Sequence, residues 1–252
     1  MQVNIANNNS NYINNTQEIS GKNGSDKSEG DENYNNEGEN NDFQGFEEEY
    51  ATIIKKYNIS FGERIKKYFK SYFKIHISPF LEALEESSYT DWNTYNIPEN
   101  PPEGSTLPKL SLKVPKDYIF SYGGIQEQRY GPFYSKYILY SICEPNFCND
   151  KYYYSEKLYI RFILELKSDN NICDKNIYKT QEYFSFTNKN GVRLFSVILE
   201  TIKGTSYNIL LCNNEGYEGI VQINMPSVDA GVSIDVVKTY FKILNSIQII
   251  NN

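Results

Sequence analysis

Hydrophobic and polar positions are most clearly patterned in the last sixty residues of the chain. Three β-prone runs, at residues 192–202, 207–212 and 217–225, are separated by turn residues rich in Asn and Gly. In the third run, apolar and polar residues alternate, which is typical of a strand with one buried face. The sequence therefore predicts an antiparallel meander of three strands.

After Pro226 the hydrophobic period changes from two to about 3.6, which indicates a helix. The positions with this spacing are Ile234, Val237, Phe241 and Leu244. Ser233 is the expected N-cap, and residues 247–250 are β-prone again. This order predicts an α+β fold, in which a C-terminal helix packs on an antiparallel sheet.

The segments NKNGVRLFSVILE and NEGYEGIVQINMPS, followed by a helix that runs into YFKILNSIQII, resemble the closing half of Mog1/PsbP-like domains. An extended segment near the start of such domains is similar to LSLKVPKDYIFSYGG at residues 110–124. The resemblance covers residues 110–252, and its motifs are soft patterns. It implies the same α+β fold and a non-enzymatic accessory or binding role, because the family has no shared catalytic residues to carry over.

Residues 61–76 form the strongest amphipathic pattern, behind a shorter predicted helix at 47–57. The apolar stripe consists of Phe61, Ile65, Tyr68, Phe69, Tyr72, Phe73 and His76. The stripe either packs on the rest of the protein, or it belongs to a basic helix that contacts a protein partner or an anionic membrane surface. For the second interpretation, the expected contact residues are Lys66, Lys67, Lys70, Lys74, Phe69 and Phe73.

Charge is concentrated near the N-terminus. The first fifty residues hold eleven acidic and two basic residues, and the remainder is nearly neutral. We therefore expect no nucleic-acid partner. Residues 1–44 have few apolar positions and are predicted to be a disordered acidic tail, which could screen the lysines of the amphipathic helix. The expected order is this tail, a helical segment at 45–90, a Pro-containing linker at 91–109 and an α+β sheet domain at 110–252.

Residues 110–124 predict a strand, a turn at 115–117 and a second strand that ends in a turn at Gly123-Gly124. Residues 130–143 and 152–167 then predict a hairpin rich in tyrosine. The tyrosines in and near it are Tyr130, Tyr134, Tyr137, Tyr152, Tyr153 and Tyr154. They either build a binding face or are ordinary sheet residues with hydroxyls at the edge.

The chain shows no sign of a catalytic, cofactor or metal site, so no such residues are expected. It contains neither the P-loop pattern GxxxxGK[ST] nor the dinucleotide-binding pattern GxGxxG. Its one histidine, His76, lies on the apolar stripe. The four cysteines match no zinc spacing. Three cysteines lie near expected loops, and one disulfide could form among them: Cys143, Cys148 and Cys173. Cys212 is expected to be a small buried side chain.

The best functional prediction is thus a non-enzymatic accessory or binding protein, with a protein partner more strongly indicated than a membrane surface. The alternative is a ligand-binding protein or an enzyme whose site gathers distant residues such as Arg129 or Arg161. A purely structural surface protein is a third interpretation. The sequence shows no signal peptide or membrane-spanning run. The compartment stays open between the cytoplasm and, if a leader has been removed, an extracellular or surface-tethered position.

Overall fold

A computed structural model describes residues 37–86, 88–100, 103, 107–130, 133–147, 160–165, 181–201, 204–212, 220–228 and 231–250 of the 252-residue chain. The predicted tail therefore lies outside the described residues up to residue 36. Residues 36–252 belong to one compact unit. No helix in the described ranges is both long enough and apolar enough to cross a bilayer.

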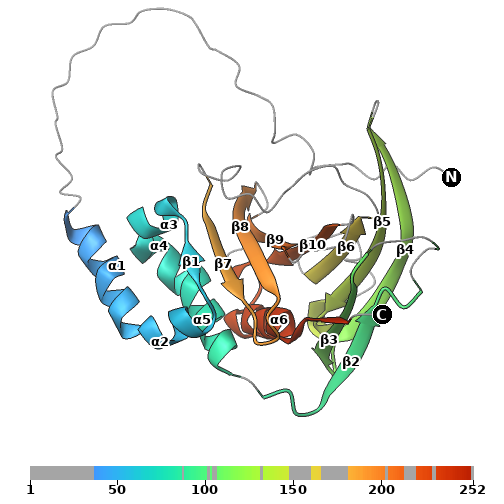
Figure 1. Ribbon diagram of the computed structural model, residues 1–252, viewed down its shortest axis with the longest axis horizontal. Coiled ribbons are helices and arrows are strands. Elements are labelled where there is room, and N and C mark those ends of the chain that lie inside the picture. Colours follow the sequence, from blue (N-terminus) through green and yellow to red (C-terminus); the bar gives the residue numbers. More distant parts are fainter. Residues whose placement is uncertain are drawn as a thin grey trace, which may run out of the picture. The chain divides into compact units, whose positions relative to one another are not determined.

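An eight-stranded antiparallel sheet forms the centre of this unit, in the order β1-β7-β8-β9-β10-β6-β5-β4 (Figure 1). Its strands are β1 (Ser60–Phe61), β4 (Ile119–Tyr130), β5 (Phe133–Cys143), β6 (Ile160–Glu165), β7 (Tyr183–Thr187), β8 (Arg193–Thr201), β9 (Gly204–Leu211) and β10 (Ile220–Pro226). The predicted meander is confirmed as β8, β9 and β10, and the pairing of β5 with β6 confirms the tyrosine-rich hairpin. The α+β fold class is thereby confirmed.

A smaller sheet has the order β11-β3-β2. Its strands are β2 (Trp92–Ile97), β3 (Lys109–Pro115) and β11 (Gln248–Ile250). The C-terminal residues thus pair with β3, as in Ile249 opposite Leu110. β2 occupies part of the segment predicted to be a linker, because the prolines that suggested a linker follow the strand and begin at Pro98.

The helices lie at the two ends of the sequence. They are α1 (Glu37–Glu49), α2 (Ala51–Lys56), α3 (Glu63–Lys67), α4 (Phe69–Tyr72), α5 (Ser78–Glu85) and α6 (Ile234–Ser246), with a π turn η1 (Phe73–Ile77) and a 3-10 turn η2 (Pro145–Phe147). The single helix predicted at 61–76 is wrong, because the chain breaks at Tyr68 (φ −114°, ψ 38°). The wider π turn then brings the neighbouring residues His76 and Ile77 into the core together.

The main core lies between one face of the large sheet and the helices α5 and α6. The ring of Phe80 in α5 lies 4.8 Å from those of Phe184 and Phe186 in β7, and 5.3 Å from that of Phe241 in α6. Burial of each such ring contributes roughly 1.5 to 3 kcal/mol. Ser233 caps α6 as predicted, since its side chain accepts the Val236 N–H.

The strand β4 is longer than the sequence suggested. The predicted turn at Gly123-Gly124 is wrong, since the chain continues through these residues as a β-bulge and stays paired with β5 up to Tyr130. Gly124 has a φ of +81°, and a Cβ on Gly123 would come within 3.0 Å of Leu139. The positive φ favours glycine at position 124, and a side chain at position 123 would crowd Leu139. At sequence level such a glycine pair is also typical of a turn.

Cys143 and Cys212 are both disulfide-bonded, so the expectation that Cys212 is only a small apolar side chain is wrong. Cys143 ends β5 and Cys212 follows β9, three strands away in the sheet. That separation is about 14 Å, twice the Cα–Cα distance that a disulfide spans. The two cysteines therefore belong to different disulfides, and Cys148 and Cys173 lie outside the described residues.

Candidate functional site

The two phenylalanines of the predicted contact helix are turned toward the protein. Phe69 is only 6 % exposed, and its ring lies 5.2 Å from Phe43 and 4.7 Å from Phe46. Phe73 is half-buried, 5.3 Å from Phe69. These side chains attach α1 to α4 and η1, and only part of Phe73 is left for a partner.

The four lysines of the same prediction lie on the outer side of the helices. Lys66 pairs with Glu63 at 3.1 Å and Lys70 with Asp42 at 2.6 Å, whereas Lys67 lies over the ring of Tyr68. Lys74 is exposed. Of the four lysines, Lys67 contacts an exposed ring, that of Tyr68, and contact with a membrane surface stays a prediction.

His76 is buried, and its Nδ1 lies 2.8 Å from the hydroxyl of Tyr207 on β9. This hydrogen bond joins the π turn to the centre of the sheet. The placement agrees with the packed histidine expected from the stripe. Among the described residues, no group of three potential metal ligands comes together.

The most exposed large apolar side chains gather on β4. Tyr122 is 58 % exposed and Ile125 is 48 % exposed, and both lie on the end strand of the large sheet. Their cross-strand neighbours Tyr140 and Ile138 are buried in the core. We name Tyr122 and Ile125, together with the backbone of β4, the β4 edge surface.

The β-bulge creates this surface. Side chains alternate between the two faces of a strand, so without a bulge Tyr122 and Ile125 would lie on opposite faces. The extra residue shifts the register, and Tyr122 faces Tyr140 while Ile125 faces Ile138. Both side chains therefore point to the core side of the sheet. Reading the Gly pair as a turn hid this surface from sequence analysis.

A row of packed aromatic rings lies between the β4 edge surface and the core. Tyr95 of β2 stacks on Phe120 of β4 at 4.1 Å, and Phe120 stacks on Tyr140 at 5.7 Å. Tyr122 lies 5.2 Å from Tyr140. The Tyr140 hydroxyl accepts the Glu99 N–H at 3.3 Å, and burial raises the pKa of this phenol. Tyr122 is thus held on a rigid base, as in well-defined binding surfaces.

Most of the tyrosines named from the sequence cannot be placed. Tyr152, Tyr153 and Tyr154 lie outside the described residues, as do the side chains of Tyr130 and Tyr134. Tyr137 is half-buried on β5. Arg129 likewise has no described side chain.

Arg161, the other arginine proposed for a distant-residue site, pairs on β6 with Ser141 and Asn224 on the side away from the core. Both of these cross-strand neighbours are polar, and the hydroxyl of Ser141 is hydrogen-bonded to that of Ser121. The β4 edge surface is therefore the best-defined candidate site among the described residues. Comparison of the chain with protein families, curated proteins and solved structures finds no match.

Proposed function

We propose that this protein is a non-enzymatic protein-binding module, which adds an extended segment of a partner protein to the β4 edge of its sheet. The observation that carries the proposal is the exposure of Tyr122 and Ile125 side by side on β4, the end strand of the large sheet. The role expected from the Mog1/PsbP-like resemblance, accessory binding without catalysis, is of the same kind.

An end strand supplies a second kind of contact. No described strand pairs with the outer edge of β4, so this edge can accept an added strand. The partner segment would alternate apolar and polar residues, because only alternate side chains meet Tyr122 and Ile125. Burying two such side chains contributes about 3 to 6 kcal/mol, less than the roughly 8 kcal/mol of a micromolar affinity, so the added backbone hydrogen bonds and the other side chains of the partner segment must supply the rest.

Random 12-residue peptides selected by phage display against the full chain are a suitable probe. We expect the enriched peptides to show β-type alternation. Fluorescence anisotropy then compares the intact chain with the double variant Tyr122→Ser, Ile125→Ser, for which we expect at least a tenfold loss of affinity. Ile119→Ser is the matched control, because Ile119 is 49 % exposed on the same strand but on its other face.

A peptide methylated at alternate backbone nitrogens tests the strand geometry, since it cannot form the added ladder and should not bind. Equal affinity for the double variant and the control variant would contradict the proposal. So would enriched peptides with a helical period. If the intact chain dimerises through β4 and the double variant is monomeric, the occupant of the β4 edge is a second copy of this chain and not a partner protein.

A further inference from the structure

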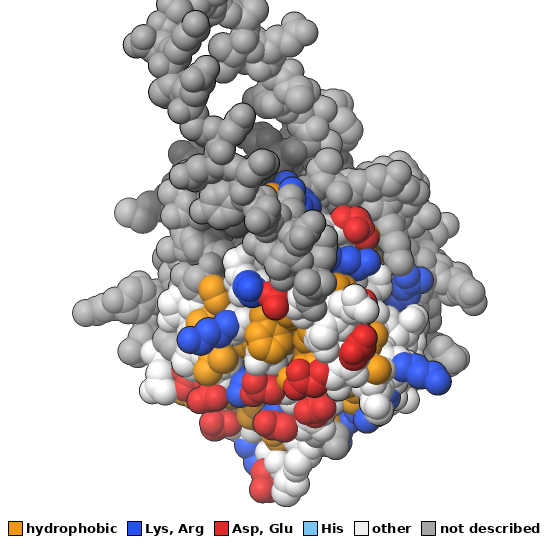
Figure 2. Space-filling view, turned by 90° about the vertical axis from the view of Figure 1, so that its left-hand side faces the viewer, with side chains coloured by type: hydrophobic (Ala, Val, Ile, Leu, Met, Phe, Trp, Pro, Cys, Tyr) orange, Lys and Arg blue, Asp and Glu red, His pale blue; other side chains and the backbone are white. Residues whose placement is uncertain are grey.

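A second surface, independent of β4, lies on the N-terminal helices. Figure 2 shows hydrophobic side chains gathered near the middle of this face, with acidic side chains in a band below them. The centre is built around Phe46, whose ring lies 4.9 Å from Tyr50 and 5.8 Å from Phe73. Tyr50, Ile54 and Phe73 are each half-buried and pack on the core from outside. We name this the acidic aromatic face.

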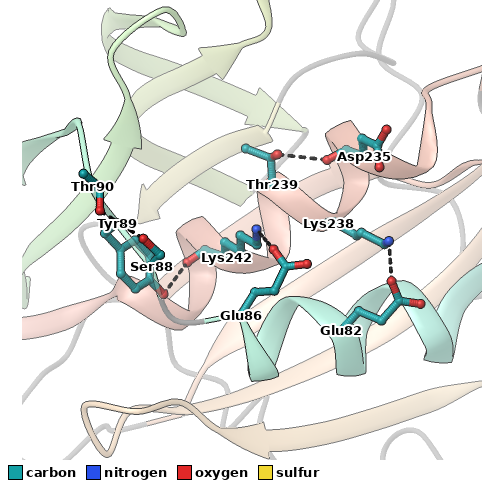
Figure 3. Close-up of polar contacts among 9 residues, drawn as sticks. All are labelled: Glu82, Glu86, Ser88, Tyr89, Thr90, Asp235, Lys238, Thr239 and Lys242. Carbon is teal, nitrogen blue, oxygen red and sulfur yellow. Dashed lines mark hydrogen bonds and ion pairs between the residues drawn. The ribbon is translucent and has the colours of Figure 1, made fainter.

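The acidic band comes from the end of α1 and from α5. In α5, Glu82 and Glu86 form ion pairs with Lys238 and Lys242 of α6, which Figure 3 shows. The exposed Glu85 has no ion-pair partner among the described residues. The same holds for the exposed carboxylates that end α1, which are Glu47, Glu48 and Glu49.

These charges meet at the aromatic centre. Burial raises the pKa of Tyr50, and the negative charges of Glu49, Glu85 and Glu82 raise it further. Tyr50 directly follows Glu49 at the end of α1, and the hydroxyl of Tyr57, just after α2, donates to the Leu84 carbonyl of α5 at 2.7 Å. Carboxylates of α1 and α5 are thus on the same side of the molecule. An apolar centre with exposed carboxylates along one side is complementary to a partner that carries apolar and basic side chains together.

We propose that the acidic aromatic face binds an amphipathic helix of a partner protein, with basic residues beside its apolar stripe. The stripe would cover Tyr50, Ile54 and Phe73, and the basic residues would meet Glu49 and Glu85. A helix suits the face because a short apolar stripe with a period of 3.6 residues can cover these three side chains while basic residues lie beside it.

Charge distinguishes this occupant from two others. The 36 residues before α1 hold five acidic and two basic residues, so their net charge has the same sign as the carboxylates of this face. A second copy that presented the same face would bring two unneutralised carboxylate groups together. A basic helix from another protein meets neither obstacle.

A synthetic helical peptide of leucine and lysine with a 3.6-residue period is the probe. Its control has glutamate in place of every lysine. Fluorescence anisotropy with the full chain should show binding of the basic peptide only, stronger at about 20 mM than at about 300 mM salt. The double variant Glu49→Gln, Glu85→Gln removes two exposed charges without breaking a described ion pair, and we expect about a tenfold loss of affinity at low salt.

The matched control is Glu103→Gln, Asp117→Asn, which removes two exposed charges outside the face. Equal loss of affinity in both double variants would reduce the effect to net charge and overturn the proposal. Binding of the acidic peptide, or no binding of either peptide at about 1 mM, would overturn it too. Hydrogen exchange should show new protection in α1 and α5, and the Tyr122→Ser, Ile125→Ser variant should bind the basic peptide as the intact chain does, which separates this surface from the β4 edge surface.

Discussion

Single side chains tie distant segments of this protein together, and Tyr89 is a clear case. Its hydroxyl donates to the Lys242 carbonyl of α6 at 3.2 Å. Its ring lies 5.1 Å from Trp92 of β2 and 3.6 Å below the ammonium of Lys189. Burial raises the pKa of Tyr89 to about 12, and it does the same to the pKa of Tyr118.

These two tyrosines predict the behaviour of the protein in alkali. A raised pKa means that the folded state keeps the phenol proton up to about pH 12, whereas the unfolded chain loses it near pH 10. Stability from this source is complete below pH 10 and is lost between pH 10 and 12, by about 3 kcal/mol for each tyrosine. Melting temperatures across this range should fall less steeply for Tyr89→Phe and Tyr118→Phe, each compared with its own value at pH 8. Parallel curves for all three proteins would contradict the prediction.

At the residue scale, the sequence predicts what local chemistry decides. Ser233 was identified as an N-cap because a cap depends only on the residues beside it. Phe43 was assigned to a disordered tail, because the many Asn, Gly and Glu residues around it outweighed its spacing to Phe46 and Tyr50. That spacing, i, i+3 and i+7, is the signal that could have revealed α1.

At the element scale, α1 is held by aromatic contacts more than by its own helical tendency. Phe46 lies within 6 Å of five rings, those of Phe43, Tyr50, Phe61, Phe69 and Phe73. Lys70 and Asp42 add an ion pair at the surface, which is worth little. Phe43 adds contacts with Phe61 and Phe69, so α1 is attached by two aromatic side chains, of which Phe46 has the larger number of ring contacts.

Phe46→Ala should lower the free energy of unfolding by about 3 to 5 kcal/mol, because it removes a buried ring and leaves a cavity under α1. Urea denaturation measures the loss, and hydrogen exchange should show that α1 has lost protection first. Glu48→Ala, on the exposed side of the same helix, should change stability by less than about 0.5 kcal/mol. A similar loss for both variants would show that α1 is held in another way.

The glycines of two elements give an opposite pair of effects. Gly124→Ala places a side chain at a φ of +81° in the bulge and should destabilise the protein by about 1 to 2 kcal/mol. Gly45→Ala lies inside α1 with open space around the new methyl group and should stabilise it by about 1 kcal/mol. Thermal denaturation of the two variants checks the signs. A stabilising Gly124→Ala would place the bulge elsewhere.

At the scale of the whole molecule, two separate disulfides are anchored on the large sheet. One includes Cys143 at the end of β5, and the other includes Cys212, which follows β9. Each native disulfide in a domain of this kind stabilises the fold by about 2 to 4 kcal/mol. A reducing agent should therefore lower the melting temperature clearly. Mass spectrometry after alkylation of the unreduced, denatured chain should leave both cysteines unlabelled, and labelling of either one would contradict the bonds.

The arrangement of the whole molecule was only partly accessible from sequence. The meander β8-β9-β10 was predicted because consecutive strands joined by short turns usually pair. The neighbours β10 and β6 are separated by more than fifty residues, and no local pattern specifies that pairing. The β4 edge surface was missed for a related reason, since the partner β5 decides whether Gly123-Gly124 is a turn or a bulge.

The pairing of β1 with β7 also determines when the N-terminal part can fold onto the sheet during synthesis. Phe61 lies opposite Phe184, and Gly62 donates its N–H to the Tyr183 carbonyl, so the helical N-terminal part completes one end of the large sheet. A ribosome makes this part first and β7 more than a hundred residues later. Until then, the rings of α1, α4 and η1 can pack on one another but not on the sheet. A nascent chain stalled before β7 should therefore expose these rings and depend on chaperones, and release from that dependence should coincide with the synthesis of β7.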